Sequence, residues 1–512
     1  MDTSSLAHRT IKNSWYNLLA FIWPVVLSLV ATPIIVHGLG VHDYGVYVLA
    51  LVIVSFLSLL EMGWGYGFIK SLADLSARND HARINVLVSS FFWLTTFLGT
   101  VGLIIAYLFA DTLVALFKLG VAGSSPAVGA IYFAGWIFLS AMVSAVFSLI
   151  PTALQRFDVP AKWGIFSATL MNALMVAAVW QGFSVVALLA VYLLISAASF
   201  VFYFFYSKHL LPLLKVECRF DYQAVKPAAK FGFFVFLNNI ASTALIQIDR
   251  FFISAFLGPA FITFYTLPGN VAQKIHGFVS SISNVFFPLS SDLVARGDLD
   301  RLQRIYRKVV RITTILSFAS AITLWLFGYK ILFYWLGQEI ANNSISVLYY
   351  LVPTYFLLSI FVPLTNFLLG LGKPKILAFS SIFMAALNVI LVLILVPRYS
   401  IEGAALAYLL SVTPVIFLLF FLERKELMFQ GSLNFYLKIF VKLMATGAVF
   451  YLVVGYTIFN LAVGLISLIT VLPFAFASFL VLYKLMGFVE KEDWDLIVGI
   501  WLNFKNKFSN VS

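Results

Sequence analysis

The sequence has few charges and a single cysteine, and each shortage excludes a class of protein. Charged residues make up 11% of the 512 residues, whereas soluble domains carry roughly a quarter. With 62% hydrophobic residues and a mean hydropathy of +1.00, this excludes an ordinary soluble protein. The lone Cys218 excludes an intrachain disulfide framework. No small-residue cleavage site follows the first apolar run, so we expect a retained helix rather than a signal peptide.

Motifs for catalysis or cofactor binding are also missing from the sequence. No spacing of His, Cys, Asp or Glu predicts a metal site, and no nucleophile arrangement indicates an enzyme. The glycines Gly63, Gly65 and Gly67 lie at the edge of an apolar run, without the strand that a dinucleotide-binding fingerprint needs. We therefore expect no enzyme activity, no metal and no cofactor.

Long apolar runs dominate what is present. About fourteen runs reach the length of about 20 residues that a helix needs to cross a bilayer. They lie near residues 14–36, 44–62, 86–110, 127–150, 162–180, 183–206, 231–257, 261–287, 310–328, 345–371, 375–396, 402–422, 437–458 and 462–485. The connections between them are short. The predicted fold class is an all-α integral membrane protein with about 14 transmembrane helices.

Basic residues are unevenly distributed over this predicted topology. Cytoplasmic loops collect Lys and Arg, and if the N-terminus is cytoplasmic, the cytoplasmic segments carry 28 of the 33 basic residues. The opposite side has Lys118, Lys330 and Arg398, and Arg250 and Lys274 are the two basic residues that belong to neither side. The pattern predicts cytoplasmic N- and C-termini in a multi-pass protein of the inner membrane. It also explains the net charge of +12 by topology and anionic lipid, without nucleic acid.

The chain also repeats itself. DLSARNDHAR (74–83) matches DLVARGDLDR (292–301) at a shift of 218, and FSATLMNAL (166–174) matches FSSIFMAAL (379–387) at a shift of 213. Six predicted helices separate equivalent positions, so the halves share one orientation and we expect a substrate site between them near mid-membrane. The expected domains are a six-helix lobe over 1–210, a parallel six-helix lobe over 211–425, and two additional helices with a cytoplasmic tail over 426–512.

Charged residues inside the predicted spans gather between residues 238 and 284. At about 1.5 Å of rise per residue, Arg250 and Lys274 lie ~10 Å and ~20 Å below the outer ends of their helices, too deep to reach the outer surface. Charges at membrane depth generally face a cavity and serve a function. Two cations beside one acid suit an anionic group such as a phosphate or a carboxylate. The alternative is that Asp249 or Glu61 neutralises each cation in an interhelical ion pair.

The eighth predicted helix adds a stripe of polar residues. Asn270, Lys274, Gly277, Ser281 and Asn284 recur at helical spacing on one face, and Gln273 and His276 belong to the adjoining strip. Tight helix packing through small and hydrogen-bonding residues is the alternative account of this stripe. The candidate substrate-binding residues are Arg250, Lys274, Asn270, Asn284, Asn239 and Gln273. The candidates for ion coupling or charge pairing are Asp249, Glu61 and His276, and an interfacial position is the alternative for Glu61.

Three stretches resemble the polysaccharide biosynthesis and export family. They are TPIIVHGLGVHDYGVYVLAL (32–51), ALIQIDRFFISAFLG (244–258) and GLGKPKILAFSSIFMAALNVILVLILVPRYSIEGAALAYLLS (370–411). The resemblance implies a lipid-linked oligosaccharide flippase, from the superfamily that includes multidrug-and-toxin extrusion pumps and the lipid II flippase. It also implies two lobes around a cationic cavity, with alternating access. Ser400 departs from the family, which usually has glycine there, and this puts the local turn in question.

The predicted function is translocation of a polyprenyl-pyrophosphate-linked oligosaccharide, an O-antigen, capsule or exopolysaccharide repeat unit. The expected partners are this lipid-linked substrate, the membrane, and the polymerase and glycosyltransferases of the same pathway. One alternative is a cation-coupled multidrug antiporter of the same fold, although residues 14–36 contain no Asp or Glu. The other is a membrane polysaccharide polymerase, although the outer connections near 111–126 and 329–344 are short for a catalytic loop.

Overall fold

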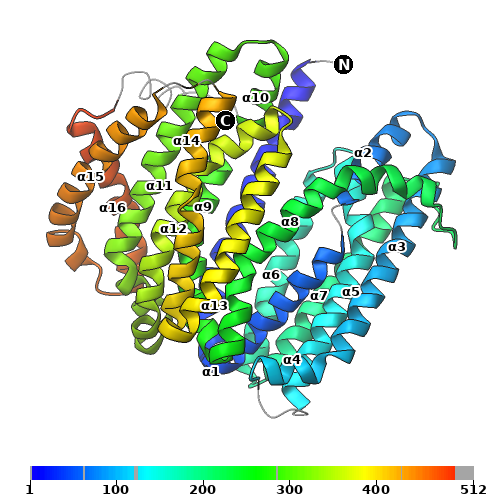
Figure 1. Ribbon diagram of the computed structural model, residues 1–512. Coiled ribbons are helices and arrows are strands. Elements are labelled where there is room, and N and C mark those ends of the chain that lie inside the picture. The colour runs from blue at the N-terminus through cyan, green and yellow to red at the C-terminus, as the bar shows by residue number, and fades with distance from the viewer. Residues whose placement is uncertain are drawn as a thin grey trace. The chain divides into compact units, whose positions relative to one another are not determined.

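The computed structural model describes residues 3–61, 64–119, 125–283, 286–427, 429 and 431–489, and these residues are almost entirely helical (Figure 1). Among them are sixteen α-helices, two short 3-10 helices and no β-strand. The α-helices are α1 (Thr3–Leu57), α2 (Trp64–Ala77), α3 (His81–Leu108), α4 (Ala110–Leu116), α5 (Ser125–Ala153), α6 (Asp158–Trp180), α7 (Val185–Leu210), α8 (Tyr222–Leu257), α9 (Pro259–Ser283), α10 (Phe286–Ala295), α11 (Leu299–Leu336), α12 (Gln338–Gly370), α13 (Pro374–Val412), α14 (Val415–Glu426), α15 (Ser432–Tyr456) and α16 (Leu465–Leu485). The 3-10 helices are η1 (Ser58–Glu61) and η2 (Phe459–Leu461). The predicted all-α class is confirmed.

Eleven segments of the described chain are long and apolar enough to cross a membrane. Two of them, residues 23–61 and 375–426, each cover two predicted spans. α1 is broken at Gly40 and α13 at Ser400, where the backbone leaves helical geometry, and these breaks separate the paired spans. α9 covers the predicted span near 261–287 but is not among the eleven. Every one of the fourteen predicted spans therefore corresponds to a helical segment.

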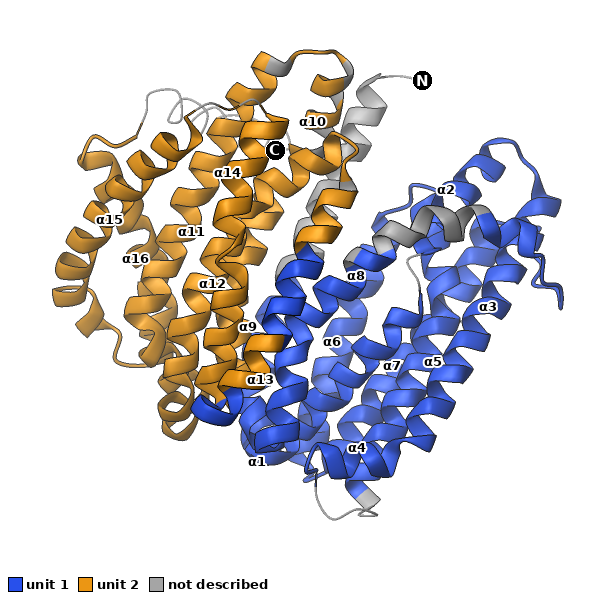
Figure 2. Cartoon of the chain, viewed as in Figure 1, with its two compact units in different colours: residues 1–263, 381–389, 396–400 blue, residues 264–380, 390–395, 401–512 orange. Residues whose placement is uncertain are grey.

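The helices form two compact units (Figure 2). Unit 1 comprises residues 1–263, 381–389 and 396–400, and unit 2 comprises residues 264–380, 390–395 and 401–512. α13 therefore contributes residues to both units. The lobe boundaries that the sequence predicts after residues 210 and 425 stay predictions.

In unit 1, α3 and α5 approach each other closely through glycine. A Cβ added at Gly102 would lie 2.3 Å from the ring of Phe138, and one at Gly135 would lie 2.9 Å from the Cβ of Ala106. Lipid tails are as apolar as leucine, so helices in a membrane associate through van der Waals packing rather than through the hydrophobic effect. The small residues permit the close backbone approach on which that packing depends.

Each unit also has its own buried aromatic core. In unit 1 the rings of Trp64 and Phe91 lie 5.0 Å apart between centroids. In unit 2 the rings of Phe450 and Phe479 lie 5.6 Å apart and belong to a cluster that joins α11 to α15 and α16. Figure 1 shows α15 and α16 side by side. The two C-terminal helices are thus packed into unit 2.

Breaks in the backbone recur along the chain at the spacing of the sequence repeat. Five residues with positive φ in the first half have counterparts 217 to 219 residues later. The pairs are Gly40 and Gly258, Asn79 and Gly297, Lys118 and Gly337, Gln155 and Gly372, and Gly182 and Ser400. The helix caps recur as well, because Asp80 accepts from the backbone N–H of Arg83 and Asp298 from that of Arg301, both at 3.1 Å. Local backbone structure therefore supports the internal repeat.

These landmarks correct one sequence alignment. The match between residues 166–174 and 379–387 has a shift of 213, but the positive-φ pairs on either side of it are 217 and 218 residues apart. The 213 alignment is therefore wrong by about one helical turn of 3.6 residues. The shift of 218 holds around Gly40 and Gly258, which pairs Arg250 with Thr32. The first repeat therefore has a neutral residue where the second has Arg250.

Ser400 keeps the helix break although it is not glycine. Its φ of 56° and ψ of −139° lie in a region that favours glycine. Its counterpart in the first repeat is Gly182, with a φ of 76°. Residues with a side chain adopt such conformations at a cost of about 1–3 kcal/mol, so the surrounding structure has to hold the break in place. The turn that the sequence comparison put in question is present.

Candidate substrate-binding site

The described site residues lie on two α-helices and one 3-10 helix, and they form two groups that belong to different units. In unit 1, α8 carries Asn239, Asp249 and Arg250, and η1 carries Glu61. In unit 2, the part of α9 from residue 264 onward carries the other candidates, Asn270, Gln273, Lys274 and His276. Asn284 lies outside the described residues. Each group is therefore described within its own unit.

Arg250 is half-buried on α8 and has no acidic partner among the described residues of unit 1. Its Nη1 donates a hydrogen bond to the Oε1 of Gln247, almost one turn earlier. Its Nε is buried and has no hydrogen-bond partner in the described part of the chain. The guanidinium is thus oriented by Gln247 and keeps an unused N–H group.

Asp249, next to Arg250 in the sequence, is engaged in packing. Asp249 is only 1% exposed, and its Oδ1 accepts a hydrogen bond of 2.8 Å from the Nδ2 of Asn388. Asn388 is itself fully buried, and it lies on the part of α13 that belongs to unit 1. The bond ties α8 to α13. We did not predict Asn388, and the available signal was one amide inside the apolar run near 375–396.

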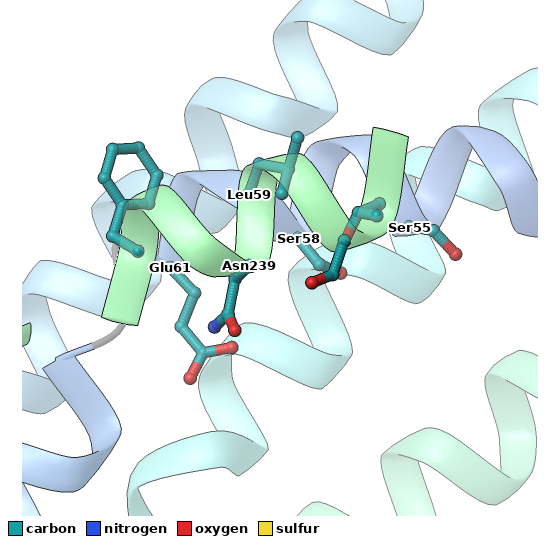
Figure 3. Close-up of a pocket in the computed structure, with 8 residues that line it drawn as sticks. Ser55, Ser58, Leu59, Glu61 and Asn239 are labelled. Atoms are coloured by element: carbon teal, nitrogen blue, oxygen red, sulfur yellow. The ribbon is translucent and has the colours of Figure 1, made fainter. Parts of the chain in front are cut away.

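A pocket in unit 1 collects polar side chains from the end of α1, from η1 and from α8 (Figure 3). Its volume is about 210 Å³. Figure 3 shows Glu61 and Asn239 extending into this space from separate helical segments. Within the described residues, no three His, Cys, Asp or Glu side chains come together as a metal site. The lining residues are Ser55, Ser58, Leu59, Glu61, Phe236, Asn239, Ser242 and Thr243.

In unit 2, α9 exposes one strip of its polar face. Lys274 and Ser281 are exposed, and Asn270 is half-buried, as is Gln273 of the adjoining strip. Lys274 forms no ion pair with another described residue of unit 2. The ammonium group is therefore not neutralised within its own unit.

The adjoining strip of α9, to which His276 and Ser283 belong, faces the interior of unit 2. Ser283 is fully buried, and the Nδ2 of Asn366 on α12 donates a 2.9 Å hydrogen bond to its backbone carbonyl oxygen. His276 is half-buried, and its Nδ1 has no hydrogen-bond partner among the described residues. Helix packing therefore accounts for Ser283 but leaves Lys274 without a structural partner in unit 2.

Unit 2 holds a further polar cluster that we did not predict. Glu423 on α14 is fully buried, and its Oε1 accepts hydrogen bonds from the hydroxyls of Tyr306 on α11 (2.7 Å) and Tyr436 on α15 (2.8 Å). The carboxylate joins three helices. Glu423 was hard to single out from the sequence, because it is the first charge after an apolar run, which is typical of the start of a cytoplasmic loop.

Sequence comparison identifies the family of this chain. A family model described as polysaccharide biosynthesis protein matches residues 38–343, which include the pocket and all of the predicted site residues. The chain belongs to the polysaccharide biosynthesis protein family. One relative, from Shigella flexneri, is named "Putative O-antigen transporter" and is 23% identical over 402 residues, covering 78% of this chain and 94% of the relative. Another, the "Uncharacterized membrane protein EpsK" of Bacillus subtilis, is 22% identical over 400 residues, covering 73% and 74%.

Solved structures with the same fold are transporters and flippases. The lipid II flippase MurJ, in an inward closed conformation, gives a TM-score of 0.67 at 16% identity, covering 92% of this chain and 99% of MurJ. An inward-facing multidrug resistance MATE family transporter gives 0.63 at 16% identity, covering 80% and 98%. At these identities the likeness shows the fold. These neighbours are transporters and flippases rather than enzymes, and this chain, with eleven segments of its described part that could cross a membrane, is a multi-pass membrane protein.

Proposed function

We propose that this protein is a transporter, a flippase that moves a polyprenyl-pyrophosphate-linked oligosaccharide across the cytoplasmic membrane to the outer leaflet. The observation that carries the proposal is Arg250, a half-buried guanidinium on an apolar helix with a buried N–H that no described residue occupies. The name of the Shigella relative supports an O-antigen repeat unit as substrate, and a capsule or exopolysaccharide unit has the same headgroup chemistry.

The pyrophosphate is the part of such a substrate that costs the most free energy to move through the bilayer. Its charge is costly to bring into an apolar environment without a partner. The cationic guanidinium of Arg250 would bind the phosphate oxygens through its planar set of N–H donors. Gln247 holds the guanidinium in one orientation. Lys274 on α9 is the second proposed headgroup contact, and its ammonium acts as a point charge. Amide side chains of Asn270 and Gln273 would add hydrogen bonds along the same helix, and Asn284, outside the described residues, is a further proposed contact.

The proposed cycle is alternating access, with the lipid tail left in the bilayer while the headgroup crosses. The breaks at Gly40 and Gly258, and at Gly182 and Ser400, are the places where helices change direction and could change angle. The orientation with both termini cytoplasmic follows from the basic residues. The polymerase and the glycosyltransferases of the same pathway would act after and before this step. Glu61, Asp249 and His276 remain the candidates for coupling transport to an ion.

Replacing Arg250 tests the proposal in a strain that depends on this protein for surface polysaccharide. We expect Arg250→Ala to lower surface polysaccharide at least about tenfold, since a charged hydrogen bond of about 1.5–3 kcal/mol is lost. Arg250→Lys should recover part of the activity because it keeps the charge without the fork. Lys274→Ala should also lower export. The control is Arg398→Ala, an exposed cation far from α8 in sequence, which should have no effect.

The amount of membrane-inserted protein has to be equal in all variants. Full surface polysaccharide with both Arg250→Ala and Lys274→Ala would contradict the assignment of these residues. A deletion strain that accumulates translocated but unpolymerised units would instead identify a polymerase. Changed drug resistance with normal polysaccharide would identify a multidrug antiporter.

A further inference from the structure

One wall of the Glu61 pocket offers hydrogen-bond acceptors. The hydroxyls of Ser55 and Ser58 donate to the backbone carbonyls of Leu51 and Val54 within α1, at 2.9 Å and 2.8 Å. Their protons are therefore in use, and what they present to the pocket is oxygen lone pairs. Glu61 makes no hydrogen bond or ion pair with any described residue of unit 1. Its carboxylate adds two acceptor oxygens to the same wall.

The opposite wall, on α8, offers donors as well as acceptors. Asn239, Ser242 and Thr243 follow one another at the i, i+3 and i+4 spacing of one helix face. None of the three side chains makes a hydrogen bond with a described residue. An amide and two hydroxyls can each donate and accept. The pocket therefore combines an acceptor wall with a mixed wall, and Glu61 and the three α8 side chains form no hydrogen bond with a described residue.

Three kinds of ligand can be compared with this arrangement. An anionic group such as pyrophosphate would meet Glu61, the one ionisable side chain among the described lining residues, and would be repelled. A bare cation would use only the acceptors, and a space of about 210 Å³ is several times the roughly 30 Å³ of one water molecule, too wide for a single ion to reach all the walls. A sugar hydroxyl donates one hydrogen bond and accepts others, which matches both walls at once.

We infer that this pocket binds one sugar residue of the transported oligosaccharide, a residue with hydroxyl or amino groups and no carboxylate. This rests on the proposed flippase function. Glu61, Ser55 and Ser58 accept hydrogen bonds from the sugar, and Asn239 donates to it. Leu59 and Phe236 give the pocket the apolar surface that the C–H face of a sugar ring requires. The headgroup phosphate binds elsewhere, at Arg250. The pocket and Arg250 therefore bind different parts of one substrate.

Flipping of two matched substrates in proteoliposomes tests this inference. One substrate is a polyprenyl-pyrophosphate disaccharide of neutral hexoses, and the other carries a uronic acid in place of a hexose. We expect the wild-type protein to flip the neutral substrate faster. Glu61→Gln should lower the neutral-to-acidic rate ratio about tenfold, because it removes both the charge that rejects the acid and a charge-assisted hydrogen bond. Asn239→Ala should slow the neutral substrate.

The control is Asn172→Ala, since the Asn172 amide donates to the carbonyl of Ala168 in its own helix α6. It should leave both rates unchanged. An unchanged rate ratio in both Glu61→Gln and Asn239→Ala would overturn the inference. The inference is also overturned if flipping by Glu61→Gln no longer depends on an ion gradient while the neutral-to-acidic rate ratio stays as in the wild type. The pocket would then be an ion-coupling site.

A binding measurement separates this inference from the flippase proposal. If the wild-type protein flips neither substrate, the flippase proposal fails, and binding of the two free disaccharides to purified protein decides about the pocket. Neutral disaccharide that binds more tightly than the acidic one, with the difference lost in Glu61→Gln, supports a sugar site. If the two disaccharides bind with equal affinity to the wild type, and also to Glu61→Gln, the sugar-site inference is overturned.

Discussion

Glu61 and Glu423 are two carboxylates in similar sequence settings with different surroundings. Each ends or follows an apolar helical run, Glu61 in unit 1 and Glu423 in unit 2. Glu61 lines a pocket and has no partner among the described residues of its unit. Glu423 is fully buried and holds two tyrosine hydroxyls. The partners of an intramembrane acid, rather than its position in the sequence, therefore separate a structural role from a binding role.

Two asparagines repeat the contrast within unit 1. Asn388 is fully buried and donates to Asp249, which fixes α8 against α13. Asn239 is exposed on α8, lines the pocket and makes no hydrogen bond with a described residue. Engaged polar groups should matter for stability, and uncommitted ones for the substrate. Each pair therefore supplies its own control.

Removing Glu423 should give the largest effect on stability. Glu423→Ala leaves the hydroxyls of Tyr306 and Tyr436 buried without their shared acceptor, at a cost of about 1–3 kcal/mol for each unsatisfied group. We expect the free energy of unfolding to fall by about 3 kcal/mol, read as a lower thermal unfolding midpoint in detergent. Glu423→Gln keeps an acceptor oxygen and should lose less. If Glu423→Ala unfolds at the same thermal midpoint as the wild type, Glu423 has no structural role and the contrast with Glu61 is wrong.

The asparagine pair should give a smaller difference. Asn388→Ala removes one interhelical hydrogen bond to a buried carboxylate, and such bonds in membranes contribute about 0.6 kcal/mol on average and up to about 1.7. We expect a loss of about 1 kcal/mol in the free energy of unfolding. Asn239→Ala should leave the thermal midpoint unchanged in the same assay. The reverse order would show that the pocket asparagine is the structural one.

The smallest effect on stability is expected at Glu61. Glu61→Gln disturbs no hydrogen bond with a described residue, so the free energy of unfolding should change by less than about 0.5 kcal/mol, as at other sites without structural contacts. The same variant should change substrate preference in the flipping assay. A large drop in the thermal midpoint would mean that Glu61 stabilises the fold, and the contrast with Glu423 would disappear.

The sequence predicted parts of the candidate site to different degrees. Arg250 and Lys274 stand out because they are basic residues that topology does not explain, and a charge in an apolar run is visible without coordinates. The possible ion pair between Arg250 and Asp249 could not be judged, because neighbours in a helix point in different directions and the partner of Asp249 is Asn388, 139 positions away. The cluster at Glu423 was missed for the same reason.

The membrane class, the helical segments and the repeat can be read from the sequence, since apolar runs, basic residues and repeated motifs are local properties of the chain. The helix breaks can be located approximately in the same way, but the repeat shift of 213 had to be corrected to 217 to 218 from the backbone conformation. Which polar side chains form hydrogen bonds, and which form none with a described residue, became visible in the folded chain. Hydrogen-bond partners such as Asn388 and Tyr436 come from distant helices. Burial and partnership therefore depend on packing, which no local pattern encodes.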